Sequence, residues 1–411
     1  MYIRILLIII LMLSHCIYAH QNNENNNTSS NISLTDININ NNYDKNNYDK
    51  NNDQLKKVVR IISLNGGGTR GYAQVGFLDK LCKTNKIKDI PKYFNLIAGT
   101  SIGALNAALL ANGMTPEEIV KFFREVSPWI FTIRSFKDLL SNNASIPSNK
   151  PNKIQKLLLI MFNSPFYKSV SENSNYGDAR LRRELTKIFG DRLLTSLKVP
   201  VLFTAYNDSK SHPVIFTNLD LKGISCVFRN VKIVDALMAS MSAPFYFPST
   251  DLYLSQNKQE KPQKIMDGVL FQNNPSLLAF TIARVLYPLA ERYCILNVGT
   301  GSGRVGLNPN TDVTELSNTQ FAKYNRLYTT AVANGTLMNN IFFTANSNIS
   351  TNQYISYYCF NFKLDKNRAC SFDTSTSEFF DYLDNEVEKQ YKHDYQKIKE
   401  FIEKSNAEDV K

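Results

Sequence analysis

A serine between two glycines is the clearest chemical signal in the chain. Ser101 is the central residue of Gly99–Gly103, a G-x-S-x-G sequence that lies between an apolar segment at 93–98 and an alanine-rich segment at 104–110. A strand, a glycine-bordered turn and a helix in that order are typical of a nucleophile elbow, which presents the serine hydroxyl at a sharp turn. The positive end of the following helix would face the reaction centre. This context favours a nucleophile over a glycine-bordered turn with an incidental serine.

A glycine-rich loop lies upstream of this serine. The segment Gly66–Gly71 follows the apolar, β-branched segment Val58–Leu64 and leads into a helical pattern that runs through Cys82. The loop fits G-x-G-x-x-G, but a dinucleotide-binding fold needs an acidic residue at the end of the next strand. That strand ends in Ala98–Ser101, without Asp or Glu. Adjacent glycines suit an oxyanion hole instead, because their backbone N–H groups can converge on a negative oxygen without a Cβ in the way.

A nucleophilic serine needs a proton acceptor, and histidine is scarce in this chain. The four histidines are His15, His20, His212 and His393. The first two lie in or beside the N-terminal apolar run, the last lies in a charged C-terminal segment, and His212 lies in a predicted turn between two strands. His212 stays open as a base, but the sequence supplies a Ser–His–Asp triad poorly.

A carboxylate that acts directly is the alternative base. Its ordinary pKa near 4 makes it weak in water. Desolvation raises that pKa, and a strong oxyanion hole lowers the basicity that the reaction needs. The candidate is Asp267, which ends a short predicted strand and precedes Gly268. Because an Asp-Gly pair is also a common turn, the residue pair alone does not identify a base.

Together these motifs resemble the patatin-like phospholipase family. The segments that carry the resemblance follow the order and spacing of that family: Gly66–Gly71, Gly99–Gly103, Ala239–Pro248, Asp267-Gly268, Asn273–Pro275 and Leu296–Gly301. The resemblance implies an α/β fold with a mostly parallel central sheet and helices on both faces, the patatin-like three-layer sandwich. It also implies a lipid acyl hydrolase of the phospholipase A type, with a Ser–Asp dyad that uses no histidine.

The functional residues of the family can be placed on this sequence one by one. The resemblance makes Ser101 the nucleophile and Asp267 the proton acceptor. It assigns the oxyanion hole to Gly66, Gly67 and Gly68. The supporting residues that it implies are Arg70, Gly71, Gly99, Gly103 and Gly268, of which the arginine is expected to brace the glycine loop. No metal or other cofactor is expected, because no carboxylate cluster or Cys/His set offers a site.

Two positions depart from the family pattern. Asn65 stands where the family commonly has Asp, and Val269 stands where it usually has Gly or Ala. Asn65 precedes the loop donors, so we expect little effect from it. Val269 adds bulk next to Asp267 and is expected to narrow the pocket or to move the carboxylate. Two alternatives on the same fold therefore stay open: a lipid-binding protein without catalysis, and an acyltransferase that passes the acyl group to an alcohol.

The segments around these motifs alternate between strands and helices. Strands are expected at 58–64, 93–98, 199–206, 214–217 and 294–298, and helices at 71–82, 104–110, 178–189, 232–241, 276–287 and 378–406. The last helix is expected to be solvated, because it is rich in charges. A further helix should begin at Pro116, where Thr115 can cap it and Glu118 can close a capping box. Such alternation indicates an α/β sheet with parallel strands.

The N-terminal part differs in composition from the rest of the chain. The apolar run Ile5–Leu13 predicts a signal peptide over 1–19, and an uncleaved signal anchor is the alternative. The Asn-rich segment 20–54 is expected to be disordered. Residues 55–411 are expected to form one patatin-like phospholipase domain with a C-terminal helical extension. We therefore expect a protein of the secretory pathway, either secreted or in an endomembrane or vacuolar lumen.

The chain is basic and rich in apolar residues. The 47 Lys and Arg exceed the 36 Asp and Glu by 11, and residues 55–411 hold 44 of these basic and 31 of these acidic side chains. This excess favours peripheral binding to anionic lipid, and the expected partner is a glycerolipid at a membrane surface. Nucleic acid is not expected, since no basic run with interleaved aromatics is present; an ordinary basic surface is the remaining alternative. No apolar run reaches the roughly 20 residues of a membrane-spanning helix.

Overall fold

The fold is known for part of the chain. The computed structural model describes residues 56–131, 178–221, 224, 226–244, 246–254, 261–302, 335–346, 354–365 and 372–407. The signal peptide expected at 1–19 and the Asn-rich segment expected at 20–54 lie outside these residues. Within the described stretches, no helix combines the length and the apolar character needed to span a bilayer.

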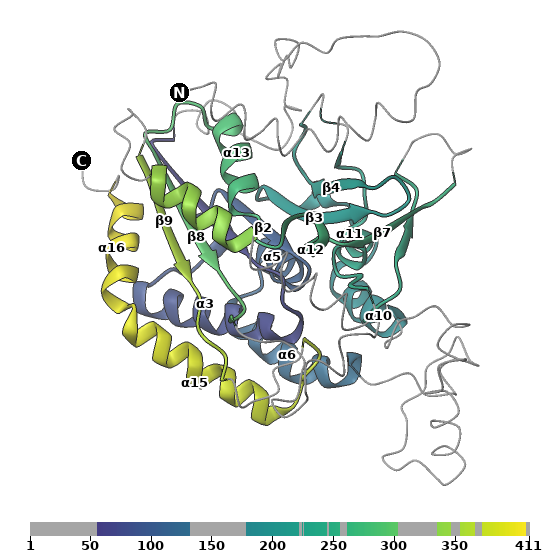
Figure 1. Ribbon diagram of the computed structural model, residues 1–411, viewed down its shortest axis with the longest axis horizontal. Helices are drawn as coiled ribbons and strands as arrows, with labels where there is room; N and C mark the ends of the chain where they lie inside the picture. Colours follow the sequence, from purple (N-terminus) through teal and green to yellow (C-terminus); the bar gives the residue numbers. More distant parts are fainter. Residues whose placement is uncertain are drawn as a thin grey trace, which may run out of the picture.

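A nine-stranded sheet lies at the centre of the fold (Figure 1). The strands are β1 Val58–Leu64, β2 Leu96–Thr100, β3 Val201–Asn207, β4 His212–Thr217, β5 Val227–Phe228, β6 Thr250–Leu252, β7 Gln263–Asp267, β8 Arg292–Val298 and β9 Tyr354–Phe360. Their main order is β5-β4-β3-β2-β1-β8-β9, with β7 paired to β3 and β6 paired to β7. The pairs β1–β2, β2–β3, β1–β8, β8–β9 and β4–β5 are parallel, whereas β3–β4, β3–β7 and β6–β7 are antiparallel. The mostly parallel sheet that the sequence predicts is therefore confirmed.

The central strand β1 explains why the sheet is covered on both faces. Its side chains alternate between two hydrophobic cores: Val59 and Ile61 belong to one core, and Val58, Ile62 and Leu64 belong to the other. Successive residues of a strand point to opposite faces. A strand that is apolar almost throughout must therefore be buried on both sides, as parallel strands in α/β folds are.

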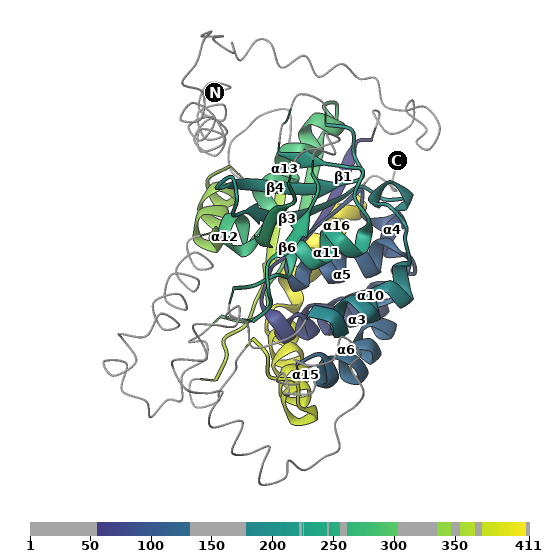
Figure 2. The same ribbon diagram turned by 90° about the vertical axis from the view of Figure 1, so that its right-hand side faces the viewer.

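Helices cover both faces of this sheet (Figure 2). They are α3 Gly71–Asn85, α4 Ile90–Tyr93, α5 Ile102–Ala111, α6 Pro116–Ile130, α10 Asp178–Phe189, α11 Ile233–Ser240, α12 Val269–Gln272, α13 Ser276–Leu286, α15 Ser377–His393 and α16 Tyr395–Asn406, and residues 335–346 are also helical. Helices α3 and α5 contribute to the core that contains Ile62, whereas α13 contributes to the core that contains Ile61. Layers of helices on the two faces of the sheet are thus confirmed.

The capping box predicted at Pro116 fixes the start of α6. Thr115 Oγ1 accepts a hydrogen bond from the Glu118 N–H at 3.3 Å, and the Glu118 carboxylate accepts one from the Thr115 N–H at 2.8 Å. These two bonds satisfy N–H groups that a helix start otherwise leaves without partners. The sequence signal is therefore confirmed at this helix.

The strand expected at 93–98 begins later than predicted. Residues Ile90–Tyr93 form the short helix α4, and the strand β2 covers Leu96–Thr100. The Asp89 side chain accepts a hydrogen bond from the Lys92 N–H at 3.1 Å and so caps this helix. A capping residue followed by a proline in the first turn favours a helix start, and here these local signals override the apolar run.

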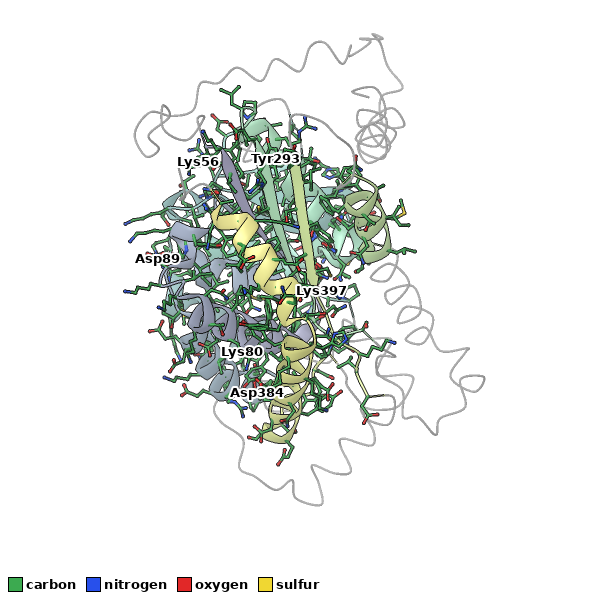
Figure 3. The ribbon with its side chains drawn as sticks, turned by 90° about the vertical axis from the view of Figure 1, so that its left-hand side faces the viewer. Lys56, Lys80, Asp89, Tyr293, Asp384 and Lys397 are labelled. Carbon is green, nitrogen blue, oxygen red and sulfur yellow. The ribbon has the colours of Figure 1, made fainter. Side chains whose placement is uncertain are left out.

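The charged C-terminal segment forms two helices, α15 and α16, that meet at Asp394. Each helix buries an apolar face, and Phe380 of α15 and Phe401 of α16 are 1% and 5% exposed. Helix α15 packs against α3, where Lys80 pairs with Glu388, and α16 packs against β9 (Figure 3). The expectation of one solvated helix is therefore wrong, because apolar residues recur at helical spacing among the charges.

Candidate active site

The predicted nucleophile elbow lies where β2 ends and α5 begins. Ser101 has φ 57° and ψ −123°, a conformation that is uncommon for a residue with a side chain. A Cβ on Gly99 would lie 2.2 Å from the Gly103 carbonyl oxygen, and a Cβ on Gly103 would lie 2.1 Å from the Leu64 carbonyl oxygen. The two glycines are therefore needed so that the turn can fold tightly against β1 and hold Ser101 in this conformation.

Hydrogen bonds from α11 fix the backbone of the elbow. The Ser101 N–H donates to Ser240 Oγ at 3.0 Å, and Ser240 Oγ donates to the Thr204 carbonyl oxygen at 2.7 Å. The carbonyl oxygens of Ser240 and Ser242 accept hydrogen bonds from the N–H groups of Gly268 and Asp267, at 3.3 and 3.1 Å. The segment 240–242 thus holds both the serine turn and the aspartate turn.

Ser101 and Asp267 meet in the folded chain. Ser101 Oγ donates a hydrogen bond to Asp267 Oδ2 at 2.6 Å, and the Val269 N–H donates to Asp267 Oδ1 at 2.8 Å. Asp267 is the last residue of β7, and its side chain is completely buried. Burial raises the pKa of this carboxyl to about 7, although the hydrogen bonds from Ser101 and the Val269 N–H oppose the rise. A group with a pKa near neutrality can accept and return a proton at the pH of most cells.

Val269 does not occupy the space expected for it. Its side chain is 2% exposed and belongs to the main hydrophobic core, and it does not line the pocket beside Ser101. Its backbone N–H orients the Asp267 carboxylate instead. The expectation that this residue narrows the pocket or displaces Asp267 is therefore wrong, since its side chain faces the core at the start of α12.

The glycine loop offers two backbone donors. The Gly66 N–H donates to the Asn273 carbonyl oxygen at 3.3 Å, and the Thr69 N–H donates to the Phe372 carbonyl oxygen at 2.8 Å. Between these two bonds, the N–H groups of Gly67 and Gly68 have no hydrogen-bond partner among the described residues. The expectation that all three glycines are free to donate is thus corrected for Gly66, whose N–H is already used.

Asn65 and Arg70 brace the two ends of this loop. The Asn65 N–H donates to the Val298 carbonyl oxygen at 3.1 Å, and Asn65 Oδ1 accepts a hydrogen bond from Asn297 at 2.7 Å. Arg70 Nε donates to the Gly67 carbonyl oxygen at 3.3 Å, and the arginine is buried. Asn65 therefore anchors the base of the loop through hydrogen bonds to β8, and Arg70 holds the peptide group that precedes Gly68.

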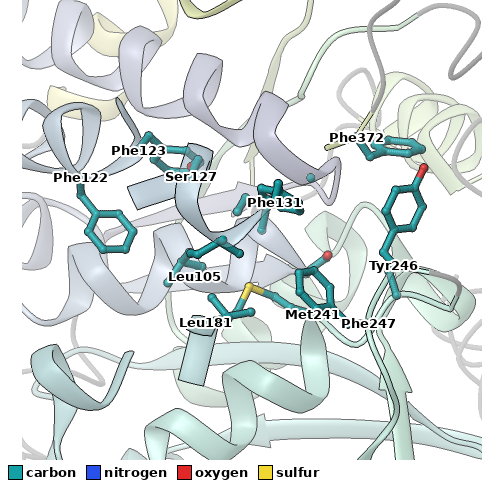
Figure 4. A pocket seen from close by; sticks show the side chains of 15 residues that line it. Leu105, Phe122, Phe123, Ser127, Phe131, Leu181, Met241, Tyr246, Phe247 and Phe372 are labelled. Carbon is teal, nitrogen blue, oxygen red and sulfur yellow. The ribbon is translucent and has the colours of Figure 1, made fainter. Parts of the chain in front are cut away.

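An apolar pocket lies beside Ser101, and Figure 4 shows side chains that line it. Its wall comes from α5, α6, α10, the segment that follows α11, and Phe372. The lining residues are Gly68, Ser101, Ile102, Leu105, Phe122, Phe123, Ser127, Ile130, Phe131, Leu181, Met241, Ala243, Tyr246, Phe247 and Phe372. Among them only the hydroxyls of two serines and one tyrosine are polar side-chain groups, so the pocket suits an alkyl chain.

His212 and His393, the two histidines among the described residues, do not form a hydrogen bond with Ser101. His212 begins β4, and its Nδ1 lies 2.8 Å from the Pro213 carbonyl oxygen. His393 is largely exposed at the end of α15, beside Asp394. Within the part of the chain that the structure describes, no three His, Cys, Asp or Glu side chains gather as a metal site would require.

Sequence comparison decides the family. The family model described as patatin-like phospholipase matches residues 62–280, which include the glycine loop, the serine elbow and the aspartate turn. The chain belongs to the patatin-like phospholipase family. Its patatin-like phospholipase segment thus extends from β1 into α13.

Several curated relatives match more than half of this chain at low identity. Patatin-like protein 1 of Arabidopsis thaliana is 26% identical over 270 residues, which is 60% of this chain and 59% of that protein. The cGAMP-activated phospholipase of Vibrio cholerae is 27% identical over 277 residues, which is 63% of this chain and 69% of that protein. Among solved structures, VipD from Legionella pneumophila aligns with a TM-score of 0.39 and 13% identity over 82% of this chain and 67% of that one.

Sequence reasoning missed several residues that build this site. Ser240 and Ser242 lie in the segment 239–248, which matches the family, but no pattern in that segment assigns them a role. Phe372 lies in a part of the chain without any motif. Ser240 and Ser242 had a sequence signal, because both lie in a block that resembles the family, whereas Phe372 had none.

Proposed function

We propose that this patatin-like phospholipase cleaves fatty acyl esters of glycerophospholipids, as a lipid acyl hydrolase of the phospholipase A type. The observation that carries the proposal is the 2.6 Å hydrogen bond from Ser101 Oγ to Asp267 Oδ2 beside an apolar pocket. The hydrogen bond provides a nucleophile and its base. The pocket provides a place for the acyl chain that the nucleophile must reach.

Acylation follows from the placement of these groups. Ser101 Oγ attacks the ester carbonyl carbon while its proton passes to Asp267, whose raised pKa makes it a better base than an exposed carboxylate. The carbonyl oxygen becomes negative and accepts hydrogen bonds from the N–H groups of Gly67 and Gly68. The ester bond then breaks, and Asp267 returns the proton to the departing alcohol, so that an acyl-enzyme and a lysolipid remain.

Deacylation repeats the same steps with water. Asp267 accepts a proton from a water molecule as that water attacks the acyl carbonyl carbon. The same two glycine N–H groups stabilise the second oxyanion. When the bond to Ser101 Oγ breaks, the proton returns to the serine and the fatty acid is released. No metal takes part in these steps, because the chain's own residues supply the nucleophile, the base and the oxyanion donors.

Further features support a reaction at a membrane. The wall of the pocket is nearly all apolar, so it binds the acyl chain and leaves the polar head group outside. The net positive charge of the chain favours peripheral binding to anionic lipid. The apolar run near residue 5 favours the secretory pathway, with a secreted protein or one in an endomembrane or vacuolar lumen.

Replacement of the nucleophile tests the proposal. Purified Ser101→Ala should lose hydrolysis of mixed phospholipid vesicles and should lose covalent labelling by a fluorophosphonate, while its circular dichroism stays that of the wild type. Ser196→Ala removes an exposed hydroxyl that does not line the pocket and is the matched control. It should keep both hydrolysis and fluorophosphonate labelling. Retained hydrolysis in Ser101→Ala would refute the assignment.

Product analysis separates the hydrolase from its alternatives. A wild-type protein that neither labels with fluorophosphonate nor releases fatty acid would be a lipid-binding protein without catalysis. A protein that labels but transfers the acyl group to an added lysolipid, rather than to water, would be an acyltransferase with the same acyl-enzyme. Free fatty acid as the main product, with and without the acceptor, is the result that we expect.

A further inference from the structure

Phe372 reaches the glycine loop from a distant part of the chain. It lies between β9 and α15, well beyond the 62–280 segment that matches the family. Its carbonyl oxygen accepts two hydrogen bonds from Thr69, one from the N–H at 2.8 Å and one from the hydroxyl at 3.2 Å. Thr69 directly follows Gly68, so these bonds fix the chain immediately after Gly67 and Gly68, whose N–H groups have no partner in the described part of the chain.

Gly68 lies directly against the same peptide group. A Cβ on Gly68 would be 2.0 Å from the Phe372 carbonyl oxygen, and Gly68 has φ +59°. This positive φ is one that glycine adopts easily. The shape of the loop at Gly68 is therefore matched to the backbone of Phe372, and any other residue at position 68 would push the two segments apart.

The ring of Phe372 holds the loop and the pocket wall together. The Arg70 guanidinium lies 4.4 Å from the centre of this ring, and Arg70 in turn donates to the Gly67 carbonyl oxygen. The ring of Tyr246 also packs edge-on against the ring of Phe372, with 6.3 Å between the two ring centres (Figure 4). Phe372 is 5% exposed, so these contacts lie in a buried environment.

We propose that Phe372 is a positioning residue for the acyl hydrolase reaction, because it holds the glycine loop from a point in the chain shortly before α15. An oxyanion hole works because its donors are already oriented before charge develops. A run of three glycines has little conformational preference of its own, so the orientation of the Gly67 and Gly68 N–H groups depends on what anchors the loop. Asn65 and Arg70 hold the two ends of the loop, and Phe372 supplies the anchor next to Gly68 through its carbonyl oxygen and its ring. The proposal rests on the proposed function, since it concerns the oxyanion donors of that reaction.

Kinetics of the full-length Phe372→Ala variant test the proposal. The substrate is p-nitrophenyl acetate, because its two-carbon acyl group does not fill the pocket and so does not report on a change in the pocket wall. The variant loses the ring contacts with Arg70 and Tyr246 and keeps the carbonyl oxygen that bonds Thr69. We therefore expect kcat to fall about 10- to 100-fold, less than the about 100- to 1,000-fold for removal of a whole oxyanion donor, with KM within about twofold of the wild type. Phe372→Tyr keeps an aromatic face for Arg70 and should restore most of kcat.

Phe379→Ala is the matched control. It removes the same atoms from a buried phenylalanine of α15 that does not line the pocket. This variant should lower Tm, as cavity formation does, and should keep kcat below its melting temperature. Thr69→Val, which removes only the hydroxyl bond to Phe372, should lower kcat with little change in Tm and serves if Phe372→Ala does not fold.

Hydrogen exchange measures the positioning without any turnover. The amides of 66–70 should exchange at least about tenfold faster in Phe372→Ala than in the wild type, because opening of the loop costs less free energy, and should stay unchanged in Phe379→Ala. Unchanged exchange of these amides, or wild-type kcat on the acetate ester in Phe372→Ala, would overturn the proposal. Ester turnover that survives in Ser101→Ala would refute the proposed function instead, while the exchange result would still decide the role of Phe372 in holding the loop.

Discussion

Replacement of Asp267 by asparagine should abolish ester hydrolysis and yet stabilise the folded protein at neutral and alkaline pH. The carboxylate is completely buried, and its two oxygens accept one hydrogen bond each from Ser101 and the Val269 N–H. An amide can take part in the same two contacts without a charge. The variant therefore keeps the packing of the site and removes the cost of ionising a buried group.

The size of this effect follows from the pKa of Asp267. Burial raises this pKa from 3.8 to about 7, and a difference of about 3 in pKa corresponds to about 4 kcal/mol at 1.36 kcal/mol for each pH unit. Because the folded-state pKa lies above the unfolded one, the unfolded state loses its proton first as the pH rises. The stability of the wild type therefore falls between about pH 4 and about pH 7 relative to the variant, and the difference levels off above pH 7.

Urea unfolding of both proteins at several pH values measures this difference. We expect nearly equal free energies of unfolding at pH 4 and an advantage for Asp267→Asn of up to about 4 kcal/mol at pH 8. Asp251→Asn makes the same chemical change at an exposed position of the neighbouring strand β6 and controls for it. An advantage that did not vary with pH would show that Asp267 has no raised pKa, and the argument for it as the base would fail.

Three further outcomes follow from the same site. The value of kcat/KM for a soluble ester should fall about tenfold for each pH unit below about 7, because burial raises the pKa of Asp267 to about 7 and the carboxylate must be ionised to accept a proton; a flat profile from pH 5 to pH 8 would contradict this. Ser240→Ala removes the oxygen that accepts the Ser101 N–H, so it should lose about 1–3 kcal/mol of unfolding free energy and also lower kcat, both measured against Ser196→Ala. Leu105→Trp should fill part of the pocket and lower kcat/KM for palmitoyl esters far more than for acetyl esters; equal losses on both would mean that the acyl chain binds elsewhere.

The parts of the fold that the sequence predicts are those with strong local signals. The strand at 58–64 is apolar almost throughout, and the start of α6 carries its capping box, so both can be read from adjacent residues. The strand β2 starts later than the apolar run, because the helix that Asp89 caps continues through Tyr93 and the strand begins only at Leu96. The burial of α15 was missed because its charges outnumber its apolar residues, although the apolar ones recur at helical spacing.

The site divides in the same way. Ser101 and its flanking glycines form a local motif, and Asp267 becomes a candidate through the order of the family's segments. The contact between Ser101 and Asp267 depends on tertiary structure. The two residues are 166 positions apart in the sequence, and the pairing of β7 with β3 brings them together. The contact between Thr69 and Phe372 joins residues 303 positions apart. No periodicity or turn signal encodes such a contact, so only the folded chain could reveal it.

The place of β8 beside β1 decides how this chain can be shortened for experiments. A fragment ended at residue 280, where the family match stops, would lack β8 and β9. The strand β1 would then lose the partner with which it pairs along all seven of its residues. An interior strand with two apolar faces would become an open edge, and such edges pair with other chains and cause aggregation. Expression fragments and chimeras should therefore keep the chain through α16, because β8 covers the edge of β1 and α16 packs against β8 and β9.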